Sequence, residues 1–345
     1  MDIQKIETLV NEICAEIKDY SLERYFTDMF QTLFKVLKEE TESADLHVMN
    51  FALKELRYGF KVFERYKNFP KVSIFGSARI SNKTPEYQIA RELGARLAQK
   101  GNMVITGAGP GVMQAGHEGA GIENSIGLNI HLPFEQEANP IIGKDPKLIT
   151  FHYFFTRKLF FLKETNAAIY LPGGFGTMDE AFEVLTLIQT GKQSPLPIIF
   201  LDKPKGHFWK NWQKFIEGQL LNSGYISPED FNLYLITDNL EEAVRYIDDF
   251  YKNYHSARYV KDEMVIRLKK TLDEAKLDEI NRQFDRILLE GKWSQGQILP
   301  EEQNSFPGLP RLIGKFNRKD IGLLHQLIFK LGYSLIDITY SKKVN

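Results

Sequence analysis

Residues 167–190 read AAIYLPGGFGTMDEAFEVLTLIQT, and this stretch decides the fold. It begins with a short apolar run at 167–171, continues with three closely spaced glycines, and shows apolar residues at helical spacing from Thr177 onward. The pattern predicts a buried strand, a glycine turn and a helix in direct succession, with Asp179 and Glu180 in the first turn of the helix. A strand that passes through a glycine turn into a helix is typical of parallel α/β sheets.

The glycine turn is suited to bind a phosphate. The first backbone N–H groups of a helix lack partners within it and lie at the positive end of its dipole, so they attract anions. Gly173, Gly174 and Gly176 allow a ligand to approach the backbone closely. Thr177 can cap the helix or bind a phosphate oxygen, and with Glu180 it also fits a capping box, which has only a structural role. A capping box alone does not require three glycines, and this favours the phosphate site.

The alternation of strand and helix patterns extends over residues 71–254. Short apolar runs are followed by stretches long enough to be helices, which predicts a parallel sheet covered by helices on both faces. Right-handed connections make such a sheet doubly wound. We therefore predict a doubly wound, mainly parallel, Rossmann-like α/β fold. The predicted strands are 72–75, 103–106, 126–130, 148–151, 167–171, 196–201 and 233–236, and the predicted helices are 86–99, 112–122, 154–164, 177–190, 208–221 and 240–254.

Two further regions flank this predicted nucleotide-binding catalytic domain. Residues 1–70 have apolar residues at helical spacing and predict an N-terminal helical region that ends at Pro70. Residues 255–345 predict a C-terminal helix followed by a small β-α-β addition. Within that region the helix is expected at 261–290, a linker at 293–310, strands at 312–316 and 333–339, and a second helix at 320–331.

The composition is that of an ordinary soluble protein. The chain has 44 Lys+Arg and 45 Asp+Glu, a formal net charge of -1, which argues against a nucleic-acid partner bound through a broad basic face. The single cysteine, Cys14, excludes an internal disulfide and favours a reducing compartment. The amino terminus lacks the apolar region of a secretory signal, and no apolar run has the length of a membrane span. We therefore expect no membrane partner and a cytoplasmic location.

Four segments with candidate ligand groups each follow a predicted strand. They are residues 76–79, 107–113, 156–158 and 173–180. In an open parallel sheet, ligands bind beyond the carboxyl ends of the strands, near the point where the strand order reverses, so these segments should meet at one edge. Together they supply backbone donors, hydroxyl groups, cations and a carboxylate, which suits a phosphorylated, ribose-containing ligand. The candidate substrate-binding residues are Ser77, Gly109, Gly111, Met113, Lys158, Gly173, Gly174, Gly176 and Thr177.

The pair Arg157 and Lys158 allows two interpretations. A charged pair on a helix usually faces solvent. Here aromatic residues surround the pair over residues 151–161, and a cation among bulky apolar side chains needs a partner. This favours a role in the site. His117 and His131 are interpreted as packing or surface residues and are given no role.

Two common nucleotide-binding motifs are absent from the sequence. A nicotinamide-binding Rossmann enzyme has G-x-G-x-x-G and an acidic residue at the end of the next strand, whereas here the glycines are Gly107, Gly109 and Gly111 and the next predicted strand ends without an acidic residue. Neither glycine turn is followed by the lysine of a P-loop. The ligand is therefore expected to be a mononucleotide, and neither hydride transfer nor triphosphate hydrolysis is implied.

Four motifs together resemble those of the Lonely Guy family of nucleoside monophosphate phosphoribohydrolases, whose members were long labelled possible lysine decarboxylases. They are SIFGSAR at 73–79, GAGPGVM at 107–113, the Arg157-Lys158 pair and PGGFGTMDE at 172–180. With the flanking regions, the chain is similar to the longer bacterial branch. The resemblance implies hydrolysis of the N-glycosidic bond of AMP or cytokinin riboside 5′-monophosphate, which releases the free base and ribose 5-phosphate without a metal or other cofactor. It also implies a homodimer or a larger homo-oligomer.

The resemblance further implies that Arg157 and Glu180 form the catalytic pair and that the glycine turn with Thr177 binds the phosphate. Cleavage of the bond between C1′ and the base builds positive charge on the ribose, which a carboxylate can stabilise while it orients water. We expect Glu180 to take this role, with Asp179 as the alternative, and Arg157 to stabilise the departing base or hold the nucleotide.

Two other classes of function stay open. A non-catalytic nucleotide carrier or sensor also fits the glycine turns, although it gives no reason for Arg157 and Glu180 together. A pyridoxal-phosphate lysine decarboxylase follows only from the old label, because no residue marks a Schiff-base lysine with a partner for the pyridinium nitrogen. The sequence leaves open the preferred base, the oligomer size and any regulation through the flanking regions.

Overall fold

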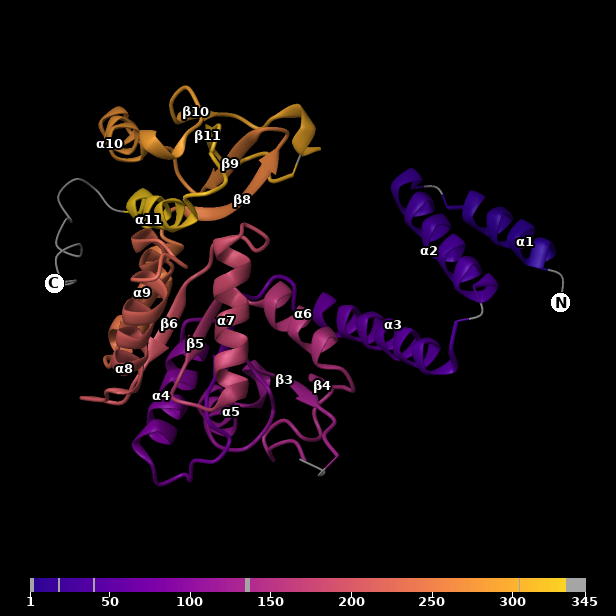
Figure 1. Cartoon of the computed structure of the whole chain (residues 1–345), viewed down its shortest axis with the longest axis horizontal. Helices are drawn as coiled ribbons and strands as arrows, with labels where there is room; N and C mark the ends of the chain where they lie inside the picture. The colour runs from indigo at the N-terminus through magenta and orange to yellow at the C-terminus, as the bar shows by residue number, and fades with distance from the viewer. Residues whose placement is uncertain (1–2, 18, 40, 134–136, 304, 333–345) are drawn as a thin grey trace. The chain divides into compact units, whose positions relative to one another are not determined.

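A seven-stranded sheet organises residues 58–345, and its neighbouring strands all run parallel (Figure 1). The strands lie in the order β4-β3-β2-β1-β5-β6-β7. Their bounds are β1 Lys71–Phe75, β2 Met103–Thr106, β3 Ser125–Ile130, β4 Leu148–Phe151, β5 Ala167–Tyr170, β6 Ile198–Leu201 and β7 Tyr234–Thr237. The chain builds outward from β1 to β4 and then places β5 on the other side of β1. The strand order therefore reverses between β1 and β5, and open parallel sheets bind their ligands beside such a reversal.

The structure is a computed structural model that describes residues 3–17, 19–39, 41–133, 137–303 and 305–332. The chain divides into two compact units, residues 1–57 and 58–345. The first unit contains α1 Ile3–Ala15, α2 Tyr20–Lys38 and the larger part of α3 Ser43–Glu64, in agreement with the helical pattern of the sequence. Across the described residues, every helix is too short or too polar to cross a bilayer.

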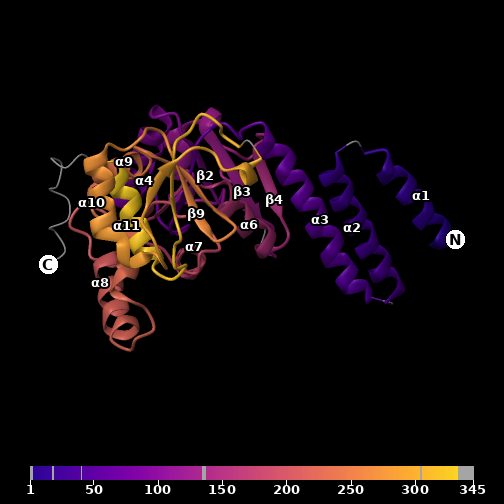
Figure 2. The same ribbon diagram turned by 90° about the horizontal axis from the view of Figure 1, so that it is seen from above.

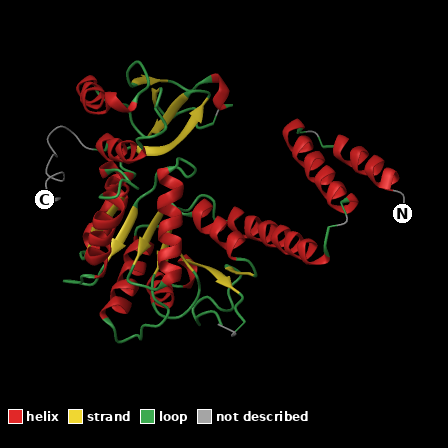
Figure 3. Cartoon of the chain, in the orientation of Figure 1, coloured by secondary structure: helices red, strands yellow, loops and turns green. Residues whose placement is uncertain are grey.

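Helices cover both faces of the parallel sheet (Figures 2 and 3). They are α4 Pro85–Gln99, α5 Val112–Ala120, α6 Phe154–Glu164, α7 Phe175–Gln189, α8 Phe208–Phe215 and α9 Leu240–Phe250. Successive strand residues point to opposite faces. Ile74 accordingly packs in one apolar cluster with α4, α5 and α9, whereas Phe75 contacts Phe161 of α6 and Phe200 contacts Trp209 of α8. The helices thus form two layers with the sheet between them.

The predicted doubly wound α/β fold is confirmed. Each predicted strand of the sheet is present, with its ends shifted by a residue or two. The helix predicted at 208–221 is α-helical only to Phe215 and continues as a π-helix over Ile216–Leu221. The helix predicted at 240–254 ends at Phe250, because Tyr254 already begins the next strand.

The C-terminal region contains a second, antiparallel sheet with the order β10-β11-β9-β8. Its elements are β8 Tyr254–Val260, β9 Glu263–Leu268, α10 Glu274–Phe284, β10 Ser294–Gly296, β11 Arg311–Gly314 and α11 Ile321–Leu331. The helix predicted over 261–290 is wrong in its first part, because residues 263–268 form a strand that pairs with residues 254–260. The segment predicted as a linker contains β10, and the strand predicted at 333–339 lies outside the described residues.

A buried cluster of charges stabilises this second sheet. The carboxylate of Glu302 is fully buried; its Oε1 lies 2.6 Å from Nη2 of Arg267 and its Oε2 lies 3.0 Å from Nε of Arg311. Burial favours the neutral acid, but hydrogen bonds from the two arginines outweigh it and lower the pKa of Glu302 to about 2. The cluster is therefore ionised, and it connects β9 and β11 to the segment between β10 and β11.

The second sheet lies at the amino ends of the parallel strands (Figure 1). In α11, Nε2 of His325 lies 3.2 Å from the carbonyl oxygen of Leu196, just before β6 begins. The carboxyl ends of the same strands are at the opposite edge. Within the described residues, the C-terminal region therefore lies at the edge opposite the candidate ligand-binding edge.

Candidate active site

The loops that follow β1, β2 and β5 meet at Ser77. Its backbone N–H donates to the carbonyl oxygen of Pro172 at 3.1 Å, and its own carbonyl oxygen accepts from Val112 N–H at 3.0 Å. Its hydroxyl oxygen accepts from Arg79 N–H at 3.1 Å. Ser77 thus connects all three loops at the strand-order reversal, and three of the four segments that the sequence predicts to converge meet there.

Two of the predicted glycines are required because the backbone there lies too close to neighbouring atoms to allow a Cβ atom. Gly111 has φ +67°, and a Cβ atom there would lie 2.3 Å from a carbonyl oxygen of the β1 loop. A Cβ atom on Gly173 would lie 2.2 Å from the hydroxyl oxygen of Thr177. At Gly174 and Gly176 the Cβ position has no atom within 4 Å, so the backbone there is open to a ligand.

Helix α7 begins two residues earlier than the sequence predicts. Its N-cap is Gly174, its first residue is Phe175, and no side chain caps it. The amides of Thr177 and Met178 both donate to the carbonyl oxygen of Gly174 at 3.1 Å. Thr177 is therefore not the N-cap, and the capping box with Glu180 does not form. The first amides of α7 lie in an exposed segment, which is the arrangement that binds anions.

Arg157 and Glu180 face each other across this edge, one from α6 and the other from α7. Nη2 of Arg157 lies 3.6 Å from Oε1 of Glu180, and their side chains are only 13% and 6% exposed. The guanidinium lies 5.1 Å from the ring centre of Phe154 and 5.7 Å from that of Phe161. Its buried Nε has no hydrogen-bond partner among the described residues. The pair is close enough to attract but leaves hydrogen-bonding capacity for a ligand.

Glu180 is held in an environment that disfavours its charge. Burial raises the pKa of Glu180 to about 7, although Lys158 and Arg157 act in the opposite direction. Tyr170 of β5 fixes the backbone of Glu180, because the Tyr170 hydroxyl donates to the carbonyl oxygen of Glu180 at 3.2 Å. A carboxyl group that titrates near neutrality in an open edge is typical of acid–base or charge-stabilising catalysis.

Lys158 lies among carboxylates. Its Nζ is 2.8 Å from Oδ2 of Asp179, 2.8 Å from Oε2 of Glu183 and 3.9 Å from Oε2 of Glu180. Burial lowers the pKa of Lys158, but hydrogen bonds to Asp179 and Glu183 outweigh it and raise that pKa overall. The solvated-surface interpretation of the pair Arg157 and Lys158 is therefore wrong, because both side chains contact acidic residues of α7.

The β2–α5 loop lies beside Arg157. A Cβ atom on Gly107 would lie 3.9 Å from Nη1 of Arg157 and 2.9 Å from the sulfur of Met113. Gly109 is buried within the same loop. The structure thus brings Gly109, Gly111 and Met113 to the same edge as Arg157 and Glu180.

A buried polar network supports this loop, and the sequence analysis did not find it. Ala108 has φ +60°, a left-handed conformation that is rare for residues with a Cβ atom. Its carbonyl oxygen accepts from the backbone N–H of Asn139 at 2.7 Å and from Nδ2 of Asn139 at 3.1 Å. The same Nδ2 reaches the carbonyl oxygen of Gly109 at 3.1 Å and Nδ1 of His117 at 3.3 Å. Burial lowers the pKa of His117 to about 4, so this histidine is neutral and has a structural role.

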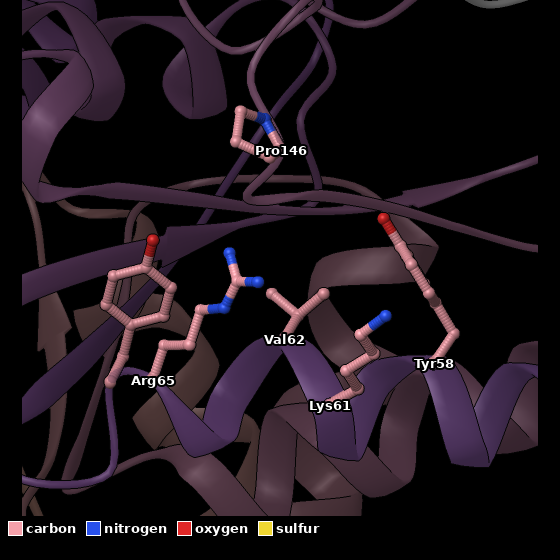
Figure 4. Close-up of a pocket in the computed structure, with 6 residues that line it drawn as sticks. Tyr58, Lys61, Val62, Arg65 and Pro146 are labelled. Atoms are coloured by element: carbon pink, nitrogen blue, oxygen red, sulfur yellow. The ribbon is translucent and has the colours of Figure 1, made fainter.

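A separate small cavity lies away from this edge (Figure 4). It is lined by Tyr58, Lys61, Val62, Arg65, Tyr66 and Pro146. Pro146 precedes β4, so the cavity lies toward the amino end of that strand. None of the residues predicted for the site lines it.

Comparisons with known proteins show which family this part of the chain is similar to. The profile of the family described as "Possible lysine decarboxylase" matches residues 107–247, which include the β2–α5 loop, both catalytic candidates and the start of α7. The chain is 30% identical over 160 residues to the cytokinin riboside 5′-monophosphate phosphoribohydrolase of Mycobacterium tuberculosis; the match covers 46% of this chain and 83% of that protein.

Two further similarities extend the comparison. The chain is 28% identical over 195 residues to cytokinin riboside 5′-monophosphate phosphoribohydrolase LOG7 of Arabidopsis thaliana, which covers 54% of this chain and 85% of that protein. Among solved structures, the molybdenum cofactor binding protein of Rippkaea orientalis is similar with a TM-score of 0.37 and 19% identity, over 52% of this chain and 96% of that one.

Proposed function

The chain belongs to the Lonely Guy family, and on that basis we propose that it hydrolyses the N-glycosidic bond of nucleoside 5′-monophosphates to free base and ribose 5-phosphate. The observation that carries the proposal is the position of Arg157 and Glu180 beside the uncapped start of α7, at the strand-order reversal. The candidate substrates are AMP and cytokinin riboside 5′-monophosphate. The N-terminal helices and the second sheet lie outside residues 107–247, which the family profile matches, and they support a place in the longer bacterial branch.

The 5′-phosphate binds at the start of α7 in this proposal. The exposed amides there carry the positive end of the helix dipole, and Gly174 and Gly176 leave the approach open. Glu180 lies one helical turn further on, so a phosphate at the helix start places the ribose toward its carboxylate. The phosphate positions the sugar and takes no part in bond cleavage.

In this proposal, the ionised carboxylate of Glu180 acts on the ribose. As the bond between C1′ and the base breaks, positive charge develops on the sugar, and the carboxylate stabilises it while it orients the attacking water. The buried setting of Glu180 strengthens this interaction, because less solvent competes for the charge. The group is available at neutral pH because its pKa is about 7.

Arg157 acts on the base. A departing purine gains electron density, and a guanidinium nearby stabilises it. The guanidinium of Arg157 lies near the rings of Phe154 and Phe161, which orient it. Its Nε has no hydrogen-bond partner among the described residues, so Arg157 can still donate a hydrogen bond to the base while it attracts Glu180.

The test is release of free base from a panel of purine and pyrimidine 5′-monophosphates, resolved by chromatography. We expect release of adenine and ribose 5-phosphate from AMP, and a loss of about a hundredfold or more in rate for Glu180→Gln with AMP binding retained. Adenosine is the matched control substrate, since it lacks the phosphate and should react far more slowly. Tight AMP binding without release of base from any monophosphate would overturn the proposal in favour of a carrier or sensor.

We also propose that the protein forms at least a homodimer. On α6, Phe154, Phe155 and Leu159 are 51%, 55% and 41% exposed, and Phe175 at the start of α7 is 97% exposed. Apolar surface of this kind on a globular protein marks an interaction site. Light scattering after size exclusion should give a mass of at least two chains, and a monomer at micromolar concentration would contradict this proposal.

A further inference from the structure

The ammonium group of Lys158 is already occupied by acidic side chains of α7. It has three N–H donors. Two are directed to Asp179 and Glu183, each at 2.8 Å, whereas Glu180 is 3.9 Å away, beyond hydrogen-bond distance. Lys158 is therefore bound to two carboxylates and lies near a third.

This setting is unsuited to a phosphate. A second anion at the ammonium would have to approach two carboxylates that are already bound to it, and like charges repel at that range. Arg157 differs, because its buried Nε has no partner among the described residues and its closest carboxylate oxygen is 3.6 Å from Nη2. The neighbouring cations therefore have different surroundings.

We infer that Lys158 is a positioning residue that keeps Glu180 ionised and holds the acidic face of α7, and that it is not a ligand of the nucleotide. The inference deepens the proposed function and rests on it only for the link between the charge of Glu180 and turnover. This role differs from the one predicted from the sequence, which counts Lys158 among the substrate-binding residues.

The groups around Glu180 explain why such a residue is needed. From α6, Arg157 and Lys158 favour its charged form; on its own helix, Glu183 and Asp179 oppose it, and burial between these elements and β5 opposes it most. Lys158 is the strongest of the groups that favour the carboxylate. Its removal would also leave the negative charges of Asp179 and Glu183 without their shared partner, and both would then act on Glu180 without compensation.

The first test compares the pH dependence of AMP hydrolysis for the wild-type protein, Lys158→Met and Lys158→Arg. For Lys158→Met we expect the midpoint of the profile to rise by about one pH unit or more, because an opposite charge at this range lowers a carboxyl pKa by that amount. Turnover at pH 7 should fall about fivefold or more for such a shift. It should recover toward the wild-type rate near pH 9, while Lys158→Arg keeps the wild-type midpoint. Equal loss of activity at every pH would overturn the inference.

The second test uses binding, which separates a charge-holding role from a ligand role. At pH 9 the dissociation constant of Lys158→Met for AMP should match that of the wild type within about twofold. A loss of tenfold or more at that pH would identify Lys158 as a phosphate ligand and overturn the inference.

A third test does not require turnover. Carboxyl ¹³C chemical shifts of glutamate-labelled protein give the titration midpoint of Glu180, assigned by comparison with Glu180→Gln. In the double variant Asp179→Asn with Glu183→Gln, Lys158 loses both bound carboxylates, and we expect the midpoint of Glu180 to fall. In Lys158→Met it should rise. A midpoint that is the same in all three proteins would overturn the inference even if no monophosphate is hydrolysed, whereas the expected shifts without hydrolysis would count against the proposed function alone.

Discussion

Replacement of Glu180 by glutamine should stabilise the fold, and the gain should depend on pH. Burial raises the pKa of Glu180 from an ordinary value of 4.5 to about 7. The folded chain therefore binds this proton more tightly than the unfolded chain does, and stability falls as the pH rises from about 4.5 to about 7. Each pKa unit corresponds to about 1.4 kcal/mol, so the ionised form costs about 3 kcal/mol above pH 7. Glutamine has nearly the same shape and no charge, so it avoids this cost.

The assay is urea unfolding of the wild type and Glu180→Gln at pH 5 and pH 8.5. Most of the difference should be absent at pH 5, where the folded wild type holds the proton. Between the two pH values the advantage of the variant should grow by about 2.5 kcal/mol. Asp179→Asn is the matched control, because it removes one carboxylate from the same turn but at a position that is 60% exposed, and its effect should stay below about 1 kcal/mol. A variant that is no more stable than the wild type at pH 8.5 would refute the reasoning.

Three other substitutions test the β2–α5 loop and the second sheet. Gly111→Ala should lower the free energy of unfolding by about 2 kcal/mol or more, because φ is +67° and the new Cβ atom would lie 2.3 Å from a carbonyl oxygen; an unchanged urea midpoint would contradict this. Asn139→Ala should cost about 1–3 kcal/mol, because the carbonyl oxygens of Ala108 and Gly109 lose a buried donor, and hydrogen exchange in the β2–α5 loop should speed up accordingly. Glu302→Ala should cost about 3–5 kcal/mol, because two buried arginines lose their counter-charge; thermal unfolding within a few degrees of the wild type would exclude it.

The parallel sheet could be predicted because its inner strands are buried on both faces. Such strands read as short apolar runs, and the glycine turns after them mark their carboxyl ends. The antiparallel hairpin of the C-terminal region was missed for the opposite reason. Strands β8 and β9 join through Lys261, which has φ +54°, where a sequence signal would normally be glycine or asparagine. Charged residues recur throughout residues 261–290, and this pattern predicted a single amphipathic helix that included the residues of β9.

The candidate site could be predicted in part. Arg157 and Glu180 were found from motifs, and the strand-to-helix pattern placed them at one edge. The predicted start of α7 was wrong because the N-cap is Gly174 and not Thr177. Glycine has no side chain that could cap the helix, so the sequence favoured Thr177. Asn139 had no local signal, since its partners in the β2–α5 loop lie some 30 residues away and are joined only by the fold.

The most direct measurement is a crystal structure of Glu180→Gln with AMP, because we expect this variant to bind AMP but to cleave it slowly. The 5′-phosphate should lie against the amides of Phe175 and Gly176, with C1′ of the ribose beside the side chain at position 180 and the base toward Arg157. AMP bound elsewhere, or bound with its phosphate at Arg157 and its base at the start of α7, would contradict the proposed placement of the reaction.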